Sequence, residues 1–333
     1  MWYNVVGDVM KVGVLGTGAY GVSLALILNE NGHNVEMWTK FEEEANYLSQ
    51  TRTSPNLKNI IIDDEIKIST NFKKTVKGAD LILIAVPAAF VDDVAKLLKK
   101  YLKPNQHICI ASKGIERDTC LFVHDVVSKH IDTDKIGVIS GPTFAIDVAN
   151  KVPVGLSLGT KNIETMNIIE EALENDHVKL RPTDDILGIE ICGSIKNVIA
   201  IANGMLDGMQ LPISTQAMMI TESLNDIKEL IDALGGRKNT ILSFAGFGDL
   251  LLTCTSVKSR NFSFGQLLGK KVSQEEIDRY IETTTIEGLY TLKSIYKLLD
   301  DKQVKMPIIN LIYDIIYGDK EPEDLLTFLI EKI

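Results

Sequence analysis

The sequence contains few cysteines, and their spacing forms no metal or disulfide motif. The chain has four among 333 residues, at Cys109, Cys120, Cys192 and Cys254, and no two of them form a CxxC pair. Its five histidines form no HExxH motif. These gaps argue against a disulfide scaffold and against a metal site. We therefore expect no metal, and a reducing, cytoplasmic location is the simplest interpretation.

Positive charge is also in deficit. The chain has 35 Lys and Arg against 45 Asp and Glu, which gives a net charge of −10. Such a balance argues against nucleic acid or an anionic membrane surface as a partner. The apolar stretches are too short for a membrane span, and no charged segment followed by an apolar run opens the chain. An anionic ligand would need a local group of basic residues.

The length favours two domains. With 333 residues, of which 45% are hydrophobic, either half can bury its own core. Residues 1–10 precede the first predicted strand, and Met10 offers an alternative start. We place the boundary near Leu187, which divides the chain into one domain over 1–187 and a second over 188–333.

The first half alternates between β-rich apolar runs and helical repeats. Strands are expected at 11–16, 34–38, 66–69, 81–86, 107–112, 135–140, 154–158 and 178–181. Helices are expected at 19–31, 42–49, 88–101 and 120–130, and 51–65 is expected to be irregular. Apolar runs bounded by turn residues suit a parallel sheet covered on both faces. The fold class is therefore α/β, a doubly wound, Rossmann-like sheet.

Helical periodicity dominates the second half. Helices are expected at 188–206, 215–234, 246–251, 274–281, 291–299 and 310–317. The C-terminal domain is therefore predicted to be all-α.

A glycine motif, Gly16-Thr-Gly18-Ala-Tyr-Gly21, lies between the first strand and the first helix. In that context the first glycine permits the tight turn, Gly18 lets a pyrophosphate approach the backbone, and Gly21 lets helix and strand pack closely. The alternative is a glycine-rich turn without a ligand. We favour dinucleotide binding because strand, motif and helix follow one another in order. The domain over 1–187 is therefore expected to bind the dinucleotide, and the domain over 188–333 to bind the substrate.

The second strand ends at Thr39 and Lys40 instead of an acidic residue. A hydroxyl and a cation at that corner suit the 2′-phosphate of NADP better than they suit NAD. The alternative is that Lys40 only pairs with Glu43 or Glu44. The cofactor is thus expected to be NADP or NAD.

Across residues 187–206 only Glu190 and Lys196 are charged. A lysine in such apolar surroundings loses hydration, which lowers its pKa and suits it to proton transfer. The alternative is a surface helix whose lysine reaches water. Asn197 beside it and Gly193 three residues before it favour a functional role.

Three further segments carry polar residues where a site is expected. Small hydroxyl and amide side chains surround Arg260 in 246–265, which suits a phosphate, and Asp249 in the same segment could orient a lysine. The alternative is a solvated loop with a helix cap. The loops with Lys113 and with 140–145 follow predicted strands, at the sheet edge where α/β proteins bind ligands.

Together these motifs resemble NAD(P)-dependent glycerol-3-phosphate dehydrogenase of the bacterial type. They are Gly16 to Gly21, Ala111 to Gly114, Ser140 to Ala145, Lys196 to Ala202, Gly246 to Thr255, Ser259 to Asn261 and Ile286 to Gly288. The later motifs are more specific than the glycine motif. The resemblance implies reversible reduction of dihydroxyacetone phosphate to sn-glycerol 3-phosphate for phospholipid synthesis, and a homodimer as a possible assembly.

The resemblance also implies roles for individual residues. The catalytic residues would be Lys196, as the proton donor or acceptor, with Lys113 and Asp249. Residues on the dinucleotide would be Gly16, Gly18, Ala19, Tyr20, Gly21, Lys40, Lys113, Ala145, Arg260, Thr285 and Glu287. Residues around the substrate would be Lys113, Gly141, Thr143, Lys196, Asp249, Ser259, Arg260 and Asn261. Ala19 stands where the family usually has Ser, and Thr39-Lys40 where Gly-Arg is common.

Two other functions fit part of the pattern. Another two-domain hydroxyacid dehydrogenase would share the glycine motif and a helix lysine, but it would give no reason for the segment around Arg260. A non-catalytic NADPH-binding sensor would not need Lys196, Lys113 and Asp249.

Overall fold

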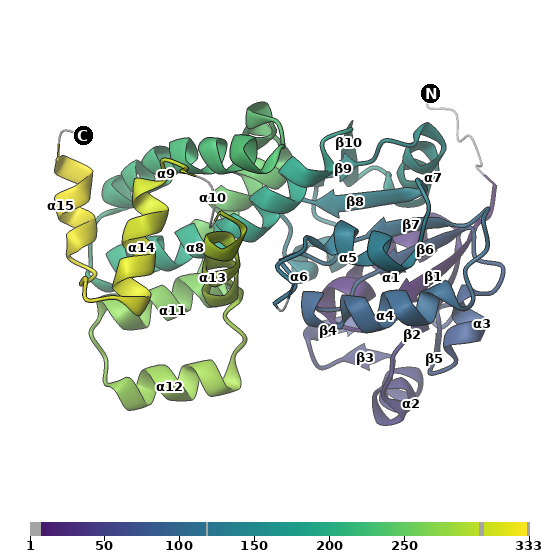
Figure 1. Cartoon of the computed structure of the whole chain (residues 1–333). Coiled ribbons are helices and arrows are strands. Elements are labelled where there is room, and N and C mark those ends of the chain that lie inside the picture. Colours follow the sequence, from purple (N-terminus) through teal and green to yellow (C-terminus); the bar gives the residue numbers. More distant parts are fainter. Residues whose placement is uncertain (1–7, 118, 300–302, 332–333) are drawn as a thin grey trace. The chain divides into compact units, whose positions relative to one another are not determined.

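An eight-stranded sheet forms the centre of the N-terminal part in the computed structural model, which describes residues 8–117, 119–299 and 303–331. The strand order is β10-β9-β8-β7-β6-β1-β2-β5 (Figure 1). The strands are β1 (Lys11–Leu15), β2 (Asn34–Trp38), β5 (Lys67–Ser69), β6 (Leu81–Ile84), β7 (His107–Ile110), β8 (Ile136–Ser140), β9 (Val154–Gly159) and β10 (Val178–Thr183). The pairs of β1 with β2 and with β6 are parallel, and so are β2–β5, β6–β7, β7–β8 and β9–β10.

The chain winds outward from β1 in both directions. Helix α1 (Ala19–Glu30) leads from β1 to β2, and α4 (Val91–Lys99) leads from β6 to β7 on the other side of β1. Because such crossovers are right-handed, these two helices cover opposite faces of the sheet. The order therefore reverses between β1 and β6, and α/β proteins bind ligands beyond the strand ends at such a point.

Shorter elements complete this part of the chain. The helices are α2 (Glu42–Thr51), α3 (Phe72–Val76), α5 (Val123–His130), α6 (Ala145–Ala149) and α7 (Ile163–Leu173), with a 3₁₀ turn at η1 (Ala88–Phe90). The strands β3 (Thr53–Ser54) and β4 (Leu57–Ile61) form a small antiparallel hairpin. The α/β fold with a largely parallel sheet is confirmed.

The chain divides into two units that do not follow a single boundary. One unit contains residues 1–112, 123–139 and 143–186, and the other contains 113–122, 140–142 and 187–333. Two loops that follow strands β7 and β8 thus belong to the helical unit. Ile115, Cys120 and Phe122, from the first of these loops, lie in its hydrophobic core.

Helices make up the rest of the second unit (Figure 1). They are α8 (Ile186–Gly208), α9 (Ile213–Leu234), α10 (Asp249–Cys254), α11 (Arg260–Gly269), α12 (Gln274–Thr283), α13 (Glu287–Leu298), α14 (Pro307–Tyr317) and α15 (Asp324–Ile330), with turns η2 (Lys238–Leu242) and η3 (Phe244–Gly248). By length and composition α8 could cross a membrane, but 83% of its apolar window is buried inside the protein. It is the central core helix of this unit.

Glycines let two helices approach the backbone of α8 very closely. A Cβ on Gly204 of α8 would lie 2.0 Å from the Phe262 carbonyl oxygen of α11, and one on Gly265 of α11 would lie 2.0 Å from the Ile201 carbonyl oxygen of α8. At Gly288 of α13 it would lie 2.7 Å from the carbonyl oxygen of Asn197. Only glycine fits such contacts, so these residues fix where α11 and α13 begin relative to α8.

Several expectations for single elements were wrong. The segment 51–65 contains the β3–β4 hairpin; β3 has only two residues, and buried and exposed residues do not alternate along β4. The helix expected at 120–130 begins only at Val123, because residues 115 and 122 pair in a β-bridge. Helices α3, α6, α7, α11 and α15 were not predicted. Both α7 and α11 have a side-chain cap, at Asn162 and Ser259, which is the signal that could have revealed them.

Candidate active site

The glycine motif forms the turn from β1 into α1 and leaves space for a ligand. Gly16 has φ +120°, and a Cβ there would lie 2.6 Å from the Ala85 carbonyl oxygen. A Cβ on Gly21 would lie 2.4 Å from the Gly16 carbonyl oxygen, whereas one on Gly18 would meet nothing within 4 Å. Gly16 and Gly21 therefore serve the turn and its packing, and Gly18 faces open space. No side chain caps the N-terminus of α1, so its N–H groups suit a pyrophosphate.

A cavity of about 590 Å³ opens beside this turn. Its walls come from the C-terminal ends of β1, β2 and β6 and from α4, which is the reversal point of the sheet. Phe41 and Phe90 line it although they are 64% and 56% exposed. Lys40 and Glu44 line it as well. This cavity has an open glycine turn, apolar walls and a polar rim, and these features together suit a dinucleotide.

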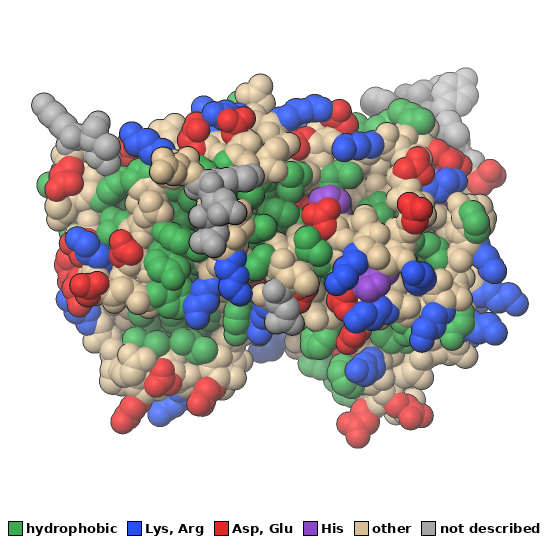
Figure 2. Space-filling view, viewed as in Figure 1, with side chains coloured by type: hydrophobic (Ala, Val, Ile, Leu, Met, Phe, Trp, Pro, Cys, Tyr) green, Lys and Arg blue, Asp and Glu red, His purple; other side chains and the backbone are tan. Residues whose placement is uncertain are grey.

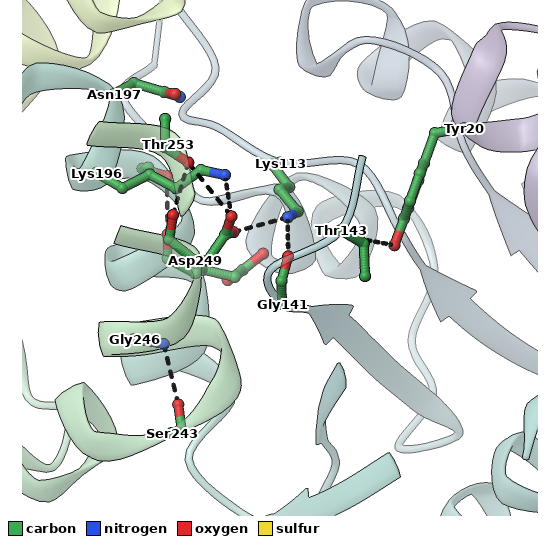
Figure 3. Close-up of polar contacts among 12 residues, drawn as sticks. Tyr20, Lys113, Gly141, Thr143, Lys196, Asn197, Ser243, Gly246, Asp249 and Thr253 are labelled. Atoms are coloured by element: carbon green, nitrogen blue, oxygen red, sulfur yellow. Dashed lines mark hydrogen bonds and ion pairs between the residues drawn. The ribbon is translucent and has the colours of Figure 1, made fainter. Parts of the chain in front are cut away.

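Three residues predicted to contact a ligand gather at the first turns of α1 and α6. The hydroxyl oxygens of Tyr20 and Thr143 lie 3.1 Å apart, in hydrogen-bond contact (Figure 3). Ser23 donates to the carbonyl oxygen of Ala145 at 2.7 Å, which ties α1 to the start of α6. Thr143 and Ala145 therefore come next to the helix that follows the glycine turn.

In the helical unit, one buried carboxylate holds two lysines (Figure 3). Lys196 Nζ donates to Asp249 Oδ1 at 2.6 Å, and Lys113 Nζ donates to Asp249 Oδ2 at 2.8 Å. Lys113 Nζ also donates to the Gly141 carbonyl oxygen at 3.2 Å. The side chain of Asp249 is 2% exposed, against 11% for Lys196 and 20% for Lys113. The three residues lie in segments far apart in sequence, and the cluster carries a net positive charge.

Local backbone features place Asp249 for this contact. Gly246 has φ −84° and ψ −108°, and a Cβ there would lie 2.2 Å from the Ile241 carbonyl oxygen, so the chain bends sharply just before α10. Ser243 accepts the N–H of Gly246 at 3.1 Å and supports the bend. Asp249 then begins α10, and Thr253 one turn later donates to the Asp249 carbonyl oxygen at 2.6 Å. The bend explains the glycines that precede the aspartate.

The environment shifts the pKa values of both partners. Burial lowers the pKa of Lys196, and the charge of Lys113 acts in the same direction, while Asp249 opposes them and only partly offsets them. Burial by itself would raise the pKa of Asp249, but the charges and hydrogen bonds of Lys113 and Lys196 outweigh it and hold that pKa below its usual value. An ionised carboxylate thus faces a lysine that gives up its proton more readily than usual.

A second polar network joins the starts of α11 and α13 to α8. Asn261 donates to Asn197 Oδ1 at 2.9 Å and accepts the N–H of Gly288 at 2.9 Å. Asn197 in turn donates to Glu287 Oε2 at 3.1 Å, and Glu287 Oε1 lies 3.7 Å from Arg260 Nη2. Arg260 is 55% exposed, while Asn197 and Asn261 are buried. The network leaves the guanidinium of Arg260 open to a ligand.

Profiles of one protein family match both parts of the chain. The profile for the N-terminus of NAD-dependent glycerol-3-phosphate dehydrogenase matches residues 11–166, and that for its C-terminus matches residues 185–327. The chain belongs to this family. A glycerol-3-phosphate dehydrogenase [NAD(P)+] from Thermoanaerobacter is 33% identical over 97% of each chain, and one from Agathobacter rectalis is 32% identical over 96% of this chain and 95% of its own.

Solved structures show the same family likeness. The glycerol-3-phosphate dehydrogenase of Coxiella burnetii aligns with a TM-score of 0.89 and 30% identity, covering 97% of this chain and 99% of its own. A D-mandelate dehydrogenase aligns over 95% of this chain with a TM-score of 0.63 but only 14% identity, which shows a shared fold alone. The resemblance read from the motifs is confirmed, and the hydroxyacid dehydrogenase alternative loses its support.

The predicted site residues of the helical unit fall into two groups. In the first group, Lys113 and Lys196 meet at the carboxylate of Asp249, and Gly141 accepts a hydrogen bond from Lys113. The second group lies at the starts of α11 and α13 and contains Ser259, Arg260, Asn261 and Glu287. Thr285 is exposed in the segment before α13. Arg260, Thr285 and Glu287 lie in the helical unit, and their contact with the dinucleotide stays a prediction. Within the residues that the structure describes, no cluster of metal-ligating side chains is found.

Three residues were not assigned a role from the sequence. Asn197 links Asn261 to Glu287, Thr253 supports Asp249, and Glu44 accepts the hydroxyl of Thr39 at 2.5 Å. The last contact corrects the argument that the Thr39 hydroxyl favours the 2′-phosphate of NADP, because this hydroxyl donates its hydrogen bond to Glu44. A spacing of four residues on a helix could have revealed Thr253.

Proposed function

We propose that this member of the family reduces dihydroxyacetone phosphate reversibly to sn-glycerol 3-phosphate, with Lys196 as the group that gives and takes the proton. One observation carries the proposal: a lysine with a lowered pKa is held at 2.6 Å by a buried aspartate. The product is a phospholipid precursor, in keeping with the family's role.

The dinucleotide would be held by the first unit. Backbone N–H groups at the start of α1, beside Gly18, would bind the pyrophosphate, and the cavity beside them would take the adenosine end. Bound NAD(P)H supplies the hydride. Tyr20 and Ala145, which stand close to this helix start, would add contacts to the dinucleotide.

Lys196 would protonate the carbonyl oxygen as it gains negative charge during reduction. A cation and a proton beside that oxygen stabilise the transition state more than they stabilise the ketone. Asp249 would keep the Lys196 ammonium group in place by accepting a hydrogen bond from one of its N–H groups. Lys113, held by the same carboxylate and by the Gly141 carbonyl oxygen, would add a second positive charge for the anionic substrate.

Arg260 and Asn261 would position the substrate through its phosphate. The guanidinium is exposed, and its fork of N–H donors matches a phosphate. Asn261 is fixed by Asn197 and by the N–H of Gly288, so its place is set before substrate arrives. Binding energy at the remote phosphate then aligns the carbonyl group with the proton donor.

Replacing Lys196 tests the proton donor. We expect Lys196→Met to lower turnover of dihydroxyacetone phosphate by about 10²–10⁴-fold, the usual contribution of a positioned acid. The reaction rate is measured from the loss of NAD(P)H absorbance. The affinity for the cofactor should change little. Lys238→Met is the matched control, because Lys238 lies in the same unit in an exposed ion pair with Glu229. Near-normal turnover of the Lys196 variant would remove it from the mechanism.

Replacing Arg260 tests the phosphate contact. Arg260→Ala should raise KM for dihydroxyacetone phosphate by about 10- to 100-fold, since a hydrogen bond to a charged group contributes about 1.5–3 kcal/mol. An unchanged KM would show that this guanidinium does not bind the phosphate.

We further propose a cytoplasmic location and a homodimer. All four cysteines are buried free thiols, which suits a reducing compartment. The dimer follows from the family resemblance alone, and sedimentation equilibrium of the purified protein tests it. A non-catalytic sensor would bind NADPH but would give no turnover in the assay above.

A further inference from the structure

The carboxylate of Glu44 is fixed at the rim of the cavity beside the glycine turn. Thr39, which directly follows β2 and is 4% exposed, donates its hydroxyl to Glu44 Oε2 at 2.5 Å. The same hydroxyl oxygen accepts the N–H of Phe41 at 3.3 Å, which orients it. Glu44 Oε2 is thus engaged, and Oε1 remains to accept a hydrogen bond from a ligand.

Basic side chains line the same cavity. Lys40, Lys96 and Lys100 face it, together with the acidic residues Glu44 and Asp93. Lys96 is tied to Asp92 at 2.5 Å. Lys40, in contrast, has no acidic side chain within ion-pair distance in the described part of the chain. The expected alternative, a pair of Lys40 with Glu43 or Glu44, is therefore not formed.

NAD(H) and NADP(H) differ only at the 2′ position of the adenosine ribose, which carries a hydroxyl in one and a phosphate in the other. A carboxylate accepts a hydrogen bond from the hydroxyl and repels the phosphate, while a lysine attracts the phosphate. A site with both groups serves either cofactor, and the balance between them sets the preference.

Resting on the proposed function, we propose that Glu44 is a specificity-determining residue, which accepts the ribose hydroxyl of NAD(H) and opposes the attraction of Lys40 for the phosphate of NADP(H). Thr39 is its positioning residue. The carboxylate that the end of the second strand lacks is thus supplied from the first turn of α2, five residues after Thr39.

Binding to the free protein tests the proposal without turnover. Dissociation constants for NADH and for NADPH are measured by their fluorescence at low ionic strength, where charge effects are least screened. We expect Glu44→Gln to shift the ratio of the two constants about tenfold in favour of NADPH, the size of effect that one nearby charge has on an anion. Glu43→Gln is the matched control, because it removes the same charge from an exposed neighbour outside the cavity.

Two further variants separate charge from orientation. Thr39→Val keeps the carboxylate but frees it, so NADH should bind several-fold more weakly while NADPH changes little. Lys40→Met should weaken NADPH and leave NADH nearly unchanged. Should Glu44→Gln fail to fold, Thr39→Val carries the same test through its effect on NADH.

Equal shifts in the Glu44 and Glu43 variants, or no shift in either, would overturn the proposal. So would an unchanged NADH constant in Thr39→Val. If the unaltered protein binds neither nucleotide, the proposed function fails instead. Normal binding and turnover with an unchanged ratio in Glu44→Gln would overturn this inference alone.

Discussion

Gly265 offers a stability test in which packing and helix propensity predict opposite signs. It lies inside α11, where alanine is normally favoured over glycine by about 1 kcal/mol. At this position, however, a Cβ would lie 2.0 Å from the Ile201 carbonyl oxygen and 2.9 Å from the Met205 nitrogen of α8. Both atoms belong to a backbone and cannot move aside by changing a rotamer. We therefore expect Gly265→Ala to destabilise the protein.

The magnitude follows from the overlap. Ordinary contact begins at 3.4 Å, so the two helices must separate by about 1.4 Å at this point. Added methyl groups in a packed core cost about 1–3 kcal/mol, and a backbone contact belongs at the upper end or above it. Subtracting the gain in helix propensity leaves a net loss of about 2 kcal/mol, which corresponds to about 4–8 °C in Tm for a unit of this size.

Calorimetry measures the fall in Tm, and the dehydrogenase assay gives an independent signal. Separation of α11 from α8 would lengthen the 2.9 Å hydrogen bond from Asn261 to Asn197, so kcat/KM for dihydroxyacetone phosphate should fall too. A rise in Tm by the amount that propensity predicts would refute the close packing of these helices.

Gly18→Ala is the control for the substitution itself. A Cβ at Gly18 meets nothing within 4 Å, and its φ of −62° suits any residue. Its free energy of unfolding should therefore stay within about 0.5 kcal/mol of that of the unaltered protein. Its KM for NAD(P)H should rise, because the methyl group enters the space proposed for the pyrophosphate.

Two predictions concern pH. Asp249 raises the pKa of Lys196, so Asp249→Asn should lower that pKa further, and reduction, which needs protonated Lys196, should fall off at a lower pH in the pH–rate profile. Asp226 is buried in α9 and accepts the N–H groups of Ile308 and Ile309 at 2.8 and 3.0 Å; burial raises its pKa from 3.8 to about 6. Its contribution to stability is thus fully present below pH 3.8 and lost as the pH rises through about 6, so Asp226→Asn should flatten the dependence of Tm on pH in that window.

Local signals in the sequence were enough to predict the eight strands of the main sheet in the first unit. The glycine motif has a fixed place between strand and helix, and each apolar strand can be recognised without knowledge of its neighbours. Lys196 could also be recognised from its own segment, since a charged residue in an apolar helix needs a partner. The structure supplies that partner in Asp249, 53 residues away.

Contacts between helices that are far apart in the sequence could not be predicted from such local signals. Helix α11 was missed because Gly265 and Gly269 count against a helix, yet the approach of α8 requires them. The link from Asn261 through Asn197 to Glu287 depends on that approach, and no spacing in the sequence announces it. The contact between Thr39 and Glu44 cannot be read from the sequence either, because nothing in the sequence shows that the Thr39 hydroxyl bonds within the chain.

The chain passes between the two units five times, and this limits how such enzymes can be recombined. A fragment that begins at residue 188 lacks Lys113 and the Gly141 carbonyl group, and it also lacks Phe122 from its own core. The helical unit is therefore a discontinuous module. A graft that transfers this unit intact to another family member has to carry three separate stretches of sequence. Breakpoints placed only near Leu187 should yield chimaeras in which the residues around the Asp249 carboxylate come from two different parents.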